Sequence, residues 1–194
     1  MKYKLVAFWL VVFGALFAFL QTRFEYHFYY IEQSQLFLFS EAYIRNKLVL
    51  PGGFSMLVAE FFVQFFIRPY VGALVTAALL TGVGICTAGI VKRIASASGL
   101  FILYVQPMLA LLFMHFDFNY RVQGTVCYLM MTALLCGYMR IRNDLFRLVA
   151  GCVLVPVLFW LAGSIAVLFA GMICLFEGLR KTPKWYISLI GVAE

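Results

Sequence analysis

The chain has 194 residues, of which 65% are hydrophobic and 12% charged, whereas soluble domains carry about 45–50% apolar and about 25% charged residues. A soluble protein of this length needs more polar residues to cover its surface, but helices that face lipid do not. The mean hydropathy of +0.99 agrees. This composition excludes a disordered chain, a coiled coil, collagen and a secreted disulfide scaffold. It indicates an all-α, polytopic transmembrane helix bundle.

The net charge of +7 comes from 15 Lys and Arg against 8 Asp and Glu. The basic residues form short clusters between apolar runs, where they set membrane topology. They build no basic face interleaved with stacking aromatic rings, so we expect no nucleic acid among the partners. The five cysteines lie inside apolar runs and form no Cys-x-x-Cys pair, which indicates neither a zinc site nor a disulfide framework.

The first expected element is a span over residues 1–22. Its apolar run is preceded by Lys2 and Lys4 and ends without a small-residue cleavage site, which favours an uncleaved helix with a cytoplasmic N-terminus. Residues 23–69 then mix charges, glutamines and aromatic rings. This pattern predicts an outer interfacial segment of short amphipathic helices, broken by Pro51-Gly52-Gly53.

Residues 54–67 are helical in pattern, with Glu60, Gln64 and Arg68 on one face. Fourteen residues rise about 21 Å, which is short of a hydrocarbon core of about 30 Å. An interfacial or re-entrant helix is therefore favoured over a span. Because phenylalanines surround its polar line, we expect Glu60 to face water or to pair with Arg68.

Residues 70–178 are expected to form five further spans, at 70–91, 99–115, 122–139, 147–160 and 163–178. Gly84 and Ala88 are a small-xxx-small pair that suits close helix packing. The stretch 148–176 is long for one span and short for two, and a turn near Gly163 favours two short helices. Residues 179–194 are expected to be a cytoplasmic loop followed by an incomplete apolar run. The whole is a single membrane domain, 1–194, of about six spans.

The distribution of basic residues favours an inside N-terminus. The six-span arrangement places ten Lys and Arg in the cytoplasm and five outside, as the positive-inside rule requires. If 54–67 crossed the membrane and the N-terminus lay outside, the count would be 11 inside against 4 outside. The short helix 54–67 and the signal-anchor pattern of the first apolar run favour the arrangement with a cytoplasmic N-terminus. We expect the membrane to be a bacterial inner membrane.

Three short motifs carry a resemblance: Tyr-x-x-Glu-Gln at 29–33, Pro-Gly-Gly at 51–53 and Gln-Phe-Phe at 64–66. With them, residues 28–69 resemble the N-terminal portion of an uncharacterised bacterial multi-pass inner-membrane family of unknown function. Members of that family are longer than this chain, which implies that the chain is a fragment. The resemblance supplies no activity.

The layout of one span, a long outer loop with membrane-surface helices and then many spans also resembles the start of GT-C-type glycosyltransferases. In those enzymes an acidic residue of the first outer loop acts on a lipid-linked sugar, and Glu32 is the positional match. The paired acidic motif typical of those enzymes is absent here, so the resemblance is one of fold alone.

Two polar sets fall on the expected outer side, Glu25-x-His27 with Glu32 and His115-x-Asp117. Carboxylates and imidazoles that converge there would bind a divalent cation and a lipid-phosphate substrate, whereas the alternative is that they are solvated interfacial residues. The catalytic candidates are Glu32 and Asp117, and the substrate-binding candidates are His27, His115, Glu60 and Arg68. The sequence assigns no metal site and identifies no cofactor.

Three functions compete. The first is a non-catalytic or accessory membrane subunit, or a fragment of a longer relative, whose partners are the bilayer and other membrane subunits. The second is a GT-C-like transferase that takes a polyprenyl-phosphate-linked donor at the outer face. The third is a transporter, which ranks last because the interiors of the expected spans carry almost no charge.

Overall fold

The computed structural model describes residues 2–94 and 101–179, and every regular element in these ranges is an α-helix. The helices are α1 (Lys2–Arg23), α2 (Glu25–Ser34), α3 (Glu41–Leu48), α4 (Gly53–Val63), α5 (Val71–Ile94), α6 (Phe101–Met114), α7 (Val122–Tyr138), α8 (Asp144–Ala162) and α9 (Ile165–Leu179). The expected all-α class is confirmed for the described residues. The expected apolar run at the C-terminus lies outside them.

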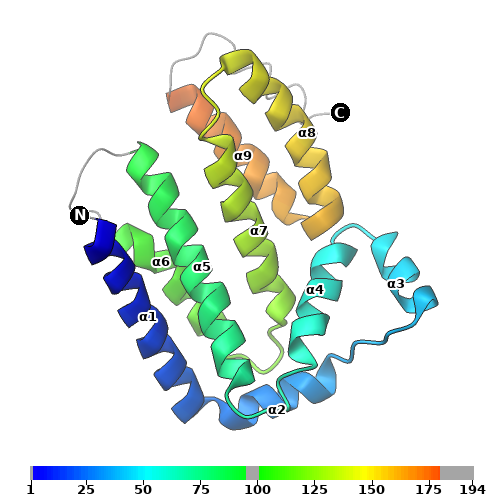
Figure 1. Cartoon of the computed structure of the whole chain (residues 1–194). Coiled ribbons are helices and arrows are strands. Elements are labelled where there is room, and N and C mark those ends of the chain that lie inside the picture. The colour runs from blue at the N-terminus through cyan, green and yellow to red at the C-terminus, as the bar shows by residue number, and fades with distance from the viewer. Residues whose placement is uncertain (1, 95–100, 180–194) are drawn as a thin grey trace.

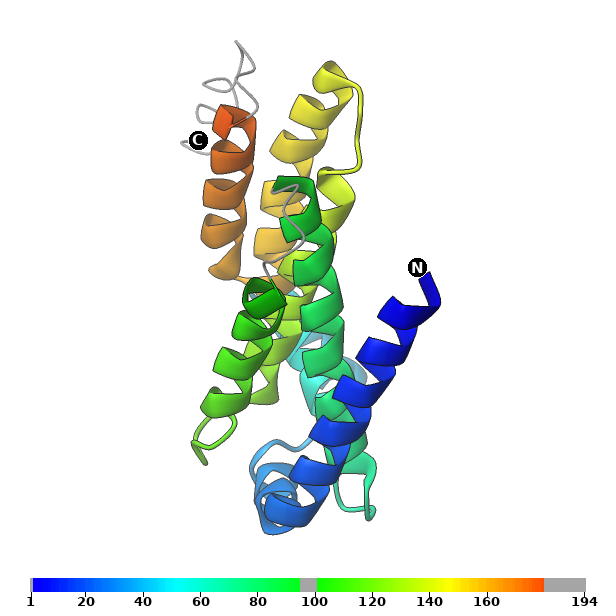
Figure 2. The same ribbon diagram turned by 90° about the vertical axis from the view of Figure 1, so that its left-hand side faces the viewer.

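Helix α5 is the centre of the bundle. Helices α1, α6 and α7 pack around it, and α8 and α9 form a hairpin on the far side of α7 (Figures 1 and 2). Within its apolar window 56% of α5 is buried, against 17% of α1 and 22% of α8. Small residues allow this packing, since a Cβ at Gly84 would lie 2.7 Å from the Trp9 ring. The close packing expected at Gly84 is therefore present.

Fewer helices are long enough to cross a membrane than the six expected. In the described ranges α1 (from Tyr3), α5 and α8 meet the length and hydropathy of a span. Helices α6, α7 and α9 have 14, 17 and 15 residues, which rise about 21–26 Å against a core of about 30 Å. The expected spans were longer because they counted residues such as His115 and Met139, which the fold places in turns.

The stretch 148–176 forms two helices, as the sequence favoured. Asn143 begins α8, because its side chain accepts hydrogen bonds from the backbone N–H groups of Leu145 (3.0 Å) and Phe146 (3.4 Å). The helix continues through Pro156 and ends at Gly163, whose φ of +73° is readily adopted only by glycine. Helix α9 then returns beside α8.

The segment 23–69 contains α2, α3 and α4 (Figure 1). Helix α2 crosses one end of the bundle under α1 and α5, and α4 packs against α7 and α8. Helix α4 ends at Val63, and tighter turns follow as far as Arg68. The expected polar line from Glu60 to Arg68 is therefore wrong, because Gln64 and Arg68 lie beyond the last residue of the helix.

The turn between α3 and α4 meets the α8–α9 turn part-way along the bundle (Figure 1). The backbone N–H of Gly52 donates to the Trp160 carbonyl at 2.9 Å, and Trp160 Nε1 donates to the Leu48 carbonyl at 3.0 Å. Gly52 has a φ of +79°, and a Cβ there would lie 3.2 Å from the backbone N of Gly163. These contacts fix where α3 and α4 lie.

Candidate functional site

A polar cavity of about 270 Å³ lies where the end of α2, helices α3 and α4 and the start of α7 meet. We call it the interfacial pocket. Its lining residues are Ser34, Gln35, Leu36, Tyr43, Lys47, Met56, Ala59, Glu60, Arg121 and Gln123. Four segments that are distant in sequence therefore contribute polar side chains to one space.

Glu60 is the acidic residue of the pocket, and its side chain is only 9% exposed. Lys47 Nζ lies 3.1 Å from its Oε1, and the Tyr43 hydroxyl donates to its Oε2. Lys47 Nζ also lies 5.3 Å from the centre of the Tyr43 ring. One turn of α3 places Tyr43 and Lys47 on the face toward α4, so the two side chains bind both carboxylate oxygens.

Burial and the hydrogen bond to the negatively charged Glu60 raise the pKa of Tyr43 to about 12. The phenol therefore stays protonated at neutral pH and keeps donating to the carboxylate. Since Lys47 balances the charge of Glu60, the net positive charge of the pocket comes from Arg121.

Arg121 is the N-cap of α7, and its side chain makes no hydrogen bond or ion pair with another described residue. Next to it, Gln123 Nε2 donates to the Gly52 carbonyl and to Ser55 Oγ, both at 3.3 Å. A helix N-terminus and an arginine without an acidic partner both favour an anion. The pocket therefore has the chemistry to bind a phosphate or carboxylate group.

The structure places the predicted binding residues of 23–69 separately. Glu60 lines the interfacial pocket and pairs with Lys47, not with Arg68 as expected. Arg68 is exposed in the α4–α5 turn and borders a separate crevice with Glu25. Glu32 is half-buried on α2 and makes no hydrogen bond or ion pair with another described residue. Its catalytic role stays a prediction.

Sequence reasoning did not identify four polar residues of the pocket: Tyr43, Lys47, Arg121 and Gln123. The sequence counted Lys47 and Arg121 only among the five outer basic residues. Their one local signal is the i, i+4 spacing of Tyr43 and Lys47 within the segment that the sequence predicted to be helical. Nothing local connects them to Glu60 or to the start of α7.

The predicted histidines lie at the same end of the molecule, in an aromatic cluster. His27 lies against the rings of Phe24 (5.6 Å between centroids) and Phe118 (4.8 Å). His115 is 2% exposed, and its Nε2 lies 2.9 Å from Thr125 Oγ1. Both rings are therefore enclosed by other side chains of this end.

Burial lowers the pKa of both histidines. The pKa of His115 falls to about 4 through burial and the nearby charge of His27. Burial also lowers the pKa of His27, against the opposing effect of Asp117. The structure thus brings His27, His115 and Asp117 into one corner and keeps the histidines neutral at neutral pH. Among the described residues, no group of three or more His, Cys, Asp and Glu is arranged as a metal site.

The comparisons with known proteins give a family but no activity. The whole chain, residues 1–194, matches the sequence model of a family of unknown function, DUF6057. The chain belongs to this family. The match confirms the resemblance to an uncharacterised family, and it shows no similarity to GT-C-type glycosyltransferases. Searches of curated proteins and of solved structures gave no match. Membership of DUF6057 therefore leaves the function to be argued from the geometry.

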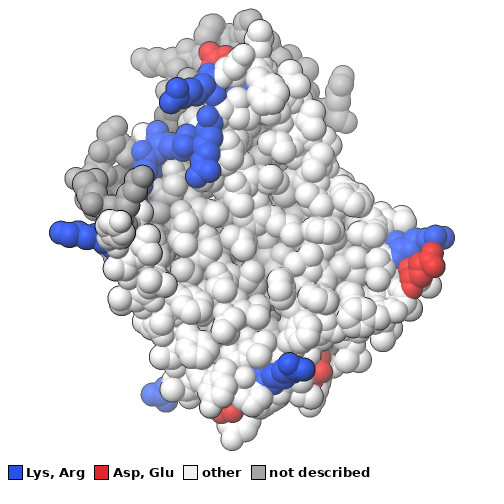
Figure 3. Space-filling model, viewed as in Figure 1, with Lys and Arg blue, Asp and Glu red and all other residues white. Residues whose placement is uncertain are grey.

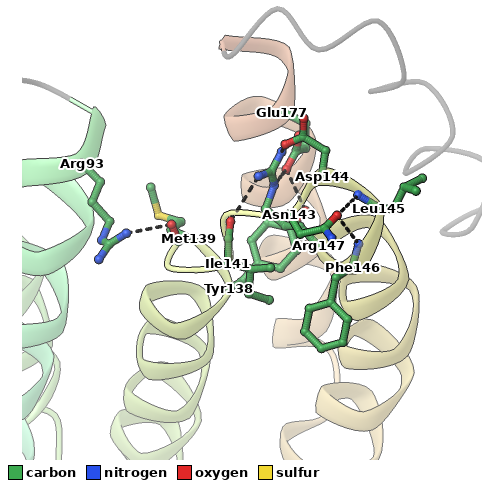
Figure 4. Close-up of polar contacts among 10 residues, drawn as sticks. All are labelled: Arg93, Tyr138, Met139, Ile141, Asn143, Asp144, Leu145, Phe146, Arg147 and Glu177. Atoms are coloured by element: carbon green, nitrogen blue, oxygen red, sulfur yellow. Dashed lines mark hydrogen bonds and ion pairs between the residues drawn. The ribbon is translucent and has the colours of Figure 1, made fainter.

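A second polar cluster of this DUF6057 chain lies at the opposite end of the bundle (Figure 4). The side chains of Arg147 and Glu177 are both 1% exposed. Arg147 Nη2 donates to Glu177 Oε2 at 3.0 Å, its Nε donates to Oε1, and the Tyr138 hydroxyl donates to the same Oε1 at 2.9 Å.

Arg147 is also bound by the Ile141 carbonyl (3.2 Å) and by Asp144 Oδ1 (2.8 Å). The cluster thus joins α7, α8 and α9 through hydrogen bonds and ion pairs among its members. The sequence counted Arg147 among the ten cytoplasmic basic residues and did not predict its burial; in the structure it is buried inside α8. We interpret the cluster as a structural clamp.

Proposed function

We propose that this chain is a single membrane domain of the bacterial inner membrane with a non-catalytic, accessory role. In this proposal the interfacial pocket binds an anionic group at the outer membrane surface. The observation that carries it is the arrangement of Arg121 beside the neutralised Glu60–Lys47 pair in a polar cavity.

The surface supports a membrane location. On the face shown in Figure 3, charged atoms gather along the upper left and along the bottom and right edges, and a broad uncharged belt runs obliquely between these two sets. Helices α1, α5 and α8 are long and apolar enough to cross this belt. In the proposed six-span arrangement the shorter α6, α7 and α9 cross beside them.

The charge at the two ends supports an outer location for the pocket. The pocket end carries Arg23, Arg45, Lys47, Arg68 and Arg121 beside Glu25, Glu32, Glu41, Glu60 and Asp117. The opposite end carries Lys4, Lys92, Arg93, Arg140, Arg142 and Arg147 beside Asp144 and Glu177. The positive-inside rule counts Lys and Arg and gives little weight to acids. With Lys2 at the start of α1, the second end has seven basic residues against five at the first, which favours a cytoplasmic location for the second end. The N-terminus is then cytoplasmic.

The location of the pocket favours a lipid-linked anion. A phosphate on a polyprenyl chain lies at headgroup depth while its chain stays in the bilayer. Arg121 would contact the phosphate, with the start of α7 adding backbone N–H donors. Lys47 is less available because Glu60 binds it.

Thermal unfolding with a short-chain polyprenyl phosphate tests this proposal, with the matching polyprenol as the uncharged control. We expect the phosphate to raise the unfolding temperature of the wild-type protein and the alcohol to have no effect. Arg121→Gln should abolish the increase, whereas Arg68→Gln, at the same end but outside the pocket, should retain it. Equal effects of phosphate and alcohol, or an unchanged response of Arg121→Gln, would contradict the proposal.

A GT-C-like transferase is the second candidate, because Glu60 is a carboxylate at the edge of the pocket. In this candidate function Glu60 takes the catalytic role that the sequence assigned to Glu32. Lys47 and Tyr43 already bind both oxygens of Glu60, so the carboxylate is less suited to take a proton from an acceptor. Transfer of the sugar from a polyprenyl-phosphate sugar to an acceptor hydroxyl, with release of polyprenyl phosphate, would favour this candidate if Glu60→Gln abolished it.

A further inference from the structure

A second cavity, larger and apolar, opens on the side of the bundle. It measures about 680 Å³ and lies between α1 and the α5–α7 pair, where α1 diverges from α5 toward its N-terminus (Figure 2). We call it the lateral groove. Its lining residues are Leu5, Val6, Trp9, Leu10, Phe13, Ala78, Thr81, Gly82, Ile85, Cys86, Ala88, Gly89, Lys92, Cys136 and Arg140. It shares no lining residue with the interfacial pocket.

Small residues of α5 create the groove. Ala78, Gly82, Cys86 and Gly89 recur every three or four residues on the face toward it. A Cβ at Gly89 would lie 2.9 Å from Cys136 Sγ, so α5 and α7 pack closely and form a continuous floor. The apolar side chains of α1 form the wall. Water is a poor solvent for such a lining, so an apolar chain must fill it in a membrane.

The groove ends at two basic residues, Lys92 and Arg140. Both are exposed, and neither makes an ion pair with a described acidic residue. Their neighbour Arg93 donates to the Met139 carbonyl at 2.8 Å, which holds the ends of α5 and α7 together (Figure 4). The positive charge is therefore concentrated at the mouth, while the rest of the lining is almost entirely apolar.

The length of the groove corresponds to one leaflet. From Ala78 to Lys92 helix α5 rises about 21 Å at 1.5 Å per residue. Half of a bilayer with its headgroups, about 40–45 Å thick in total, has the same depth. A transmembrane helix of another subunit would extend beyond the groove through the second leaflet, whereas one lipid would not.

We propose that the lateral groove binds one anionic phospholipid of the leaflet next to the basic end. An acyl chain lies along α1 and α5, and the phosphate contacts Lys92 and Arg140. Basic sites between transmembrane helices recognise anionic headgroups through this charge complementarity. This inference is independent of the interfacial pocket and its ligand.

Trp9 lines the groove and reports on its occupant. The purified chain is reconstituted in vesicles of phosphatidylcholine and phosphatidylglycerol. In one preparation the phosphatidylglycerol carries brominated acyl chains, which quench tryptophan, and in the other an equal fraction of the phosphatidylcholine carries them. Subtracting the signal of a Trp9→Phe variant isolates Trp9. We expect brominated phosphatidylglycerol to quench it more strongly, with each basic residue contributing about fivefold to the preference.

Lys92→Gln with Arg140→Gln should remove the preference, and Arg142→Gln, an exposed arginine outside the groove, should retain it. Ala78→Phe, which fills the groove from an exposed position, should reduce quenching by both lipids. Equal quenching by the two lipids, a preference that survives the double substitution, or a Trp9 that neither lipid quenches would overturn the proposal.

A second measurement does not depend on the Trp9 variant. Native mass spectrometry of the wild-type chain, released from nanodiscs with equal phosphatidylglycerol and phosphatidylcholine, should show one retained phosphatidylglycerol. The Lys92→Gln, Arg140→Gln variant should lose it. Retention of phosphatidylcholine alone, or of a copurified membrane protein in place of lipid, would contradict the assignment.

Discussion

At the scale of single residues, burial separates the ion pairs that hold the fold from those that do not. Glu60 pairs with Lys47 at side-chain exposures of 9% and 21%, whereas Glu41 and Arg45 pair at 86% and 76%. Exposed pairs contribute little, because water screens both charges in either state. Buried partners matter more, since removing one leaves the other charge unpaired away from water.

Lys47→Met therefore destabilises the protein by about 1–3 kcal/mol, because it leaves the Glu60 carboxylate with one partner fewer. Arg45→Met is the matched control on the same helix, and it should cost less than about 1 kcal/mol. Unfolding by SDS in mixed micelles measures both. Equal losses for the two variants would contradict the importance of the Glu60 contacts.

Arg147→Met is expected to cost about 3–5 kcal/mol, because the buried Glu177 carboxylate loses the guanidinium that binds both of its oxygens. The double variant Arg147→Met, Glu177→Met should recover most of this loss, since it removes both buried charges. The same SDS titration distinguishes the two. A double variant as unstable as the single one would mean that the clamp depends on its hydrogen bonds and not on charge pairing.

His115 makes stability depend on pH. Its pKa is about 4 in the folded chain against an ordinary value of 6.5, so between these values the unfolded chain binds the proton and the folded chain does not. Stability is therefore complete above pH 6.5 and falls as the pH is lowered toward 4, by up to about 3 kcal/mol. His115→Gln should flatten this part of a thermal unfolding profile. A variant with the wild-type pH profile would show that His115 is not responsible.

At the scale of elements, backbone contacts position α3 and α4. The turn before α4 packs directly on α3, since a Cβ at Gly53 would lie 1.7 Å from the Lys47 carbonyl oxygen. That oxygen belongs to the main chain, so no side-chain rotation relieves the overlap. Helix α4 can therefore lie where it does only with glycine at this position.

Gly53→Ala should strongly destabilise the protein and displace α3 from α4. Gly171→Ala is the control, because nothing lies within 4 Å of a Cβ there and alanine favours a helix by about 1 kcal/mol. Thermal unfolding in detergent compares them. If Gly53→Ala were as stable as Gly171→Ala, the close approach of α3 and α4 would be wrong.

Much of the element order could be predicted from the sequence, because apolar runs and breakers are local signals. The turn at 51–53, the two helices in 148–176 and the helical core of 54–67 all follow from Gly, Pro and hydrophobic periodicity. The ends of the helices could not be predicted. Hydropathy does not distinguish an apolar residue in a span from one in a turn, so Met139 was counted as helical.

The candidate site was less predictable than the fold. Glu60 was identified because an acid stands out among phenylalanines, but its partner was assigned to Arg68 by helical spacing. The observed partner, Lys47, lies across the Pro51-Gly52-Gly53 turn, and only the tertiary contact of α3 with α4 brings it there. Arg121 reaches the pocket because α7 begins beside α4, which no local pattern encodes.

At the scale of the whole molecule, the two ends of the bundle differ in charge and in chemistry. One end has balanced charges, the interfacial pocket and the histidine corner. The other has most of the unbalanced positive charge, the Arg147 clamp and the basic mouth of the lateral groove. The central claim is that these ends lie on opposite sides of a membrane, with the pocket outside.

Cysteine accessibility in intact cells tests this claim most directly. In a background without the five native cysteines, a membrane-impermeant maleimide is applied from outside to Asn119→Cys and Asn46→Cys, both exposed at the pocket end, and to Arg142→Cys, exposed at the basic end. We predict labelling of positions 119 and 46 in intact cells, and labelling of position 142 only after the cells are opened. Labelling of position 142 from outside, or protection of position 119, would contradict the proposed orientation and the outer location of the pocket.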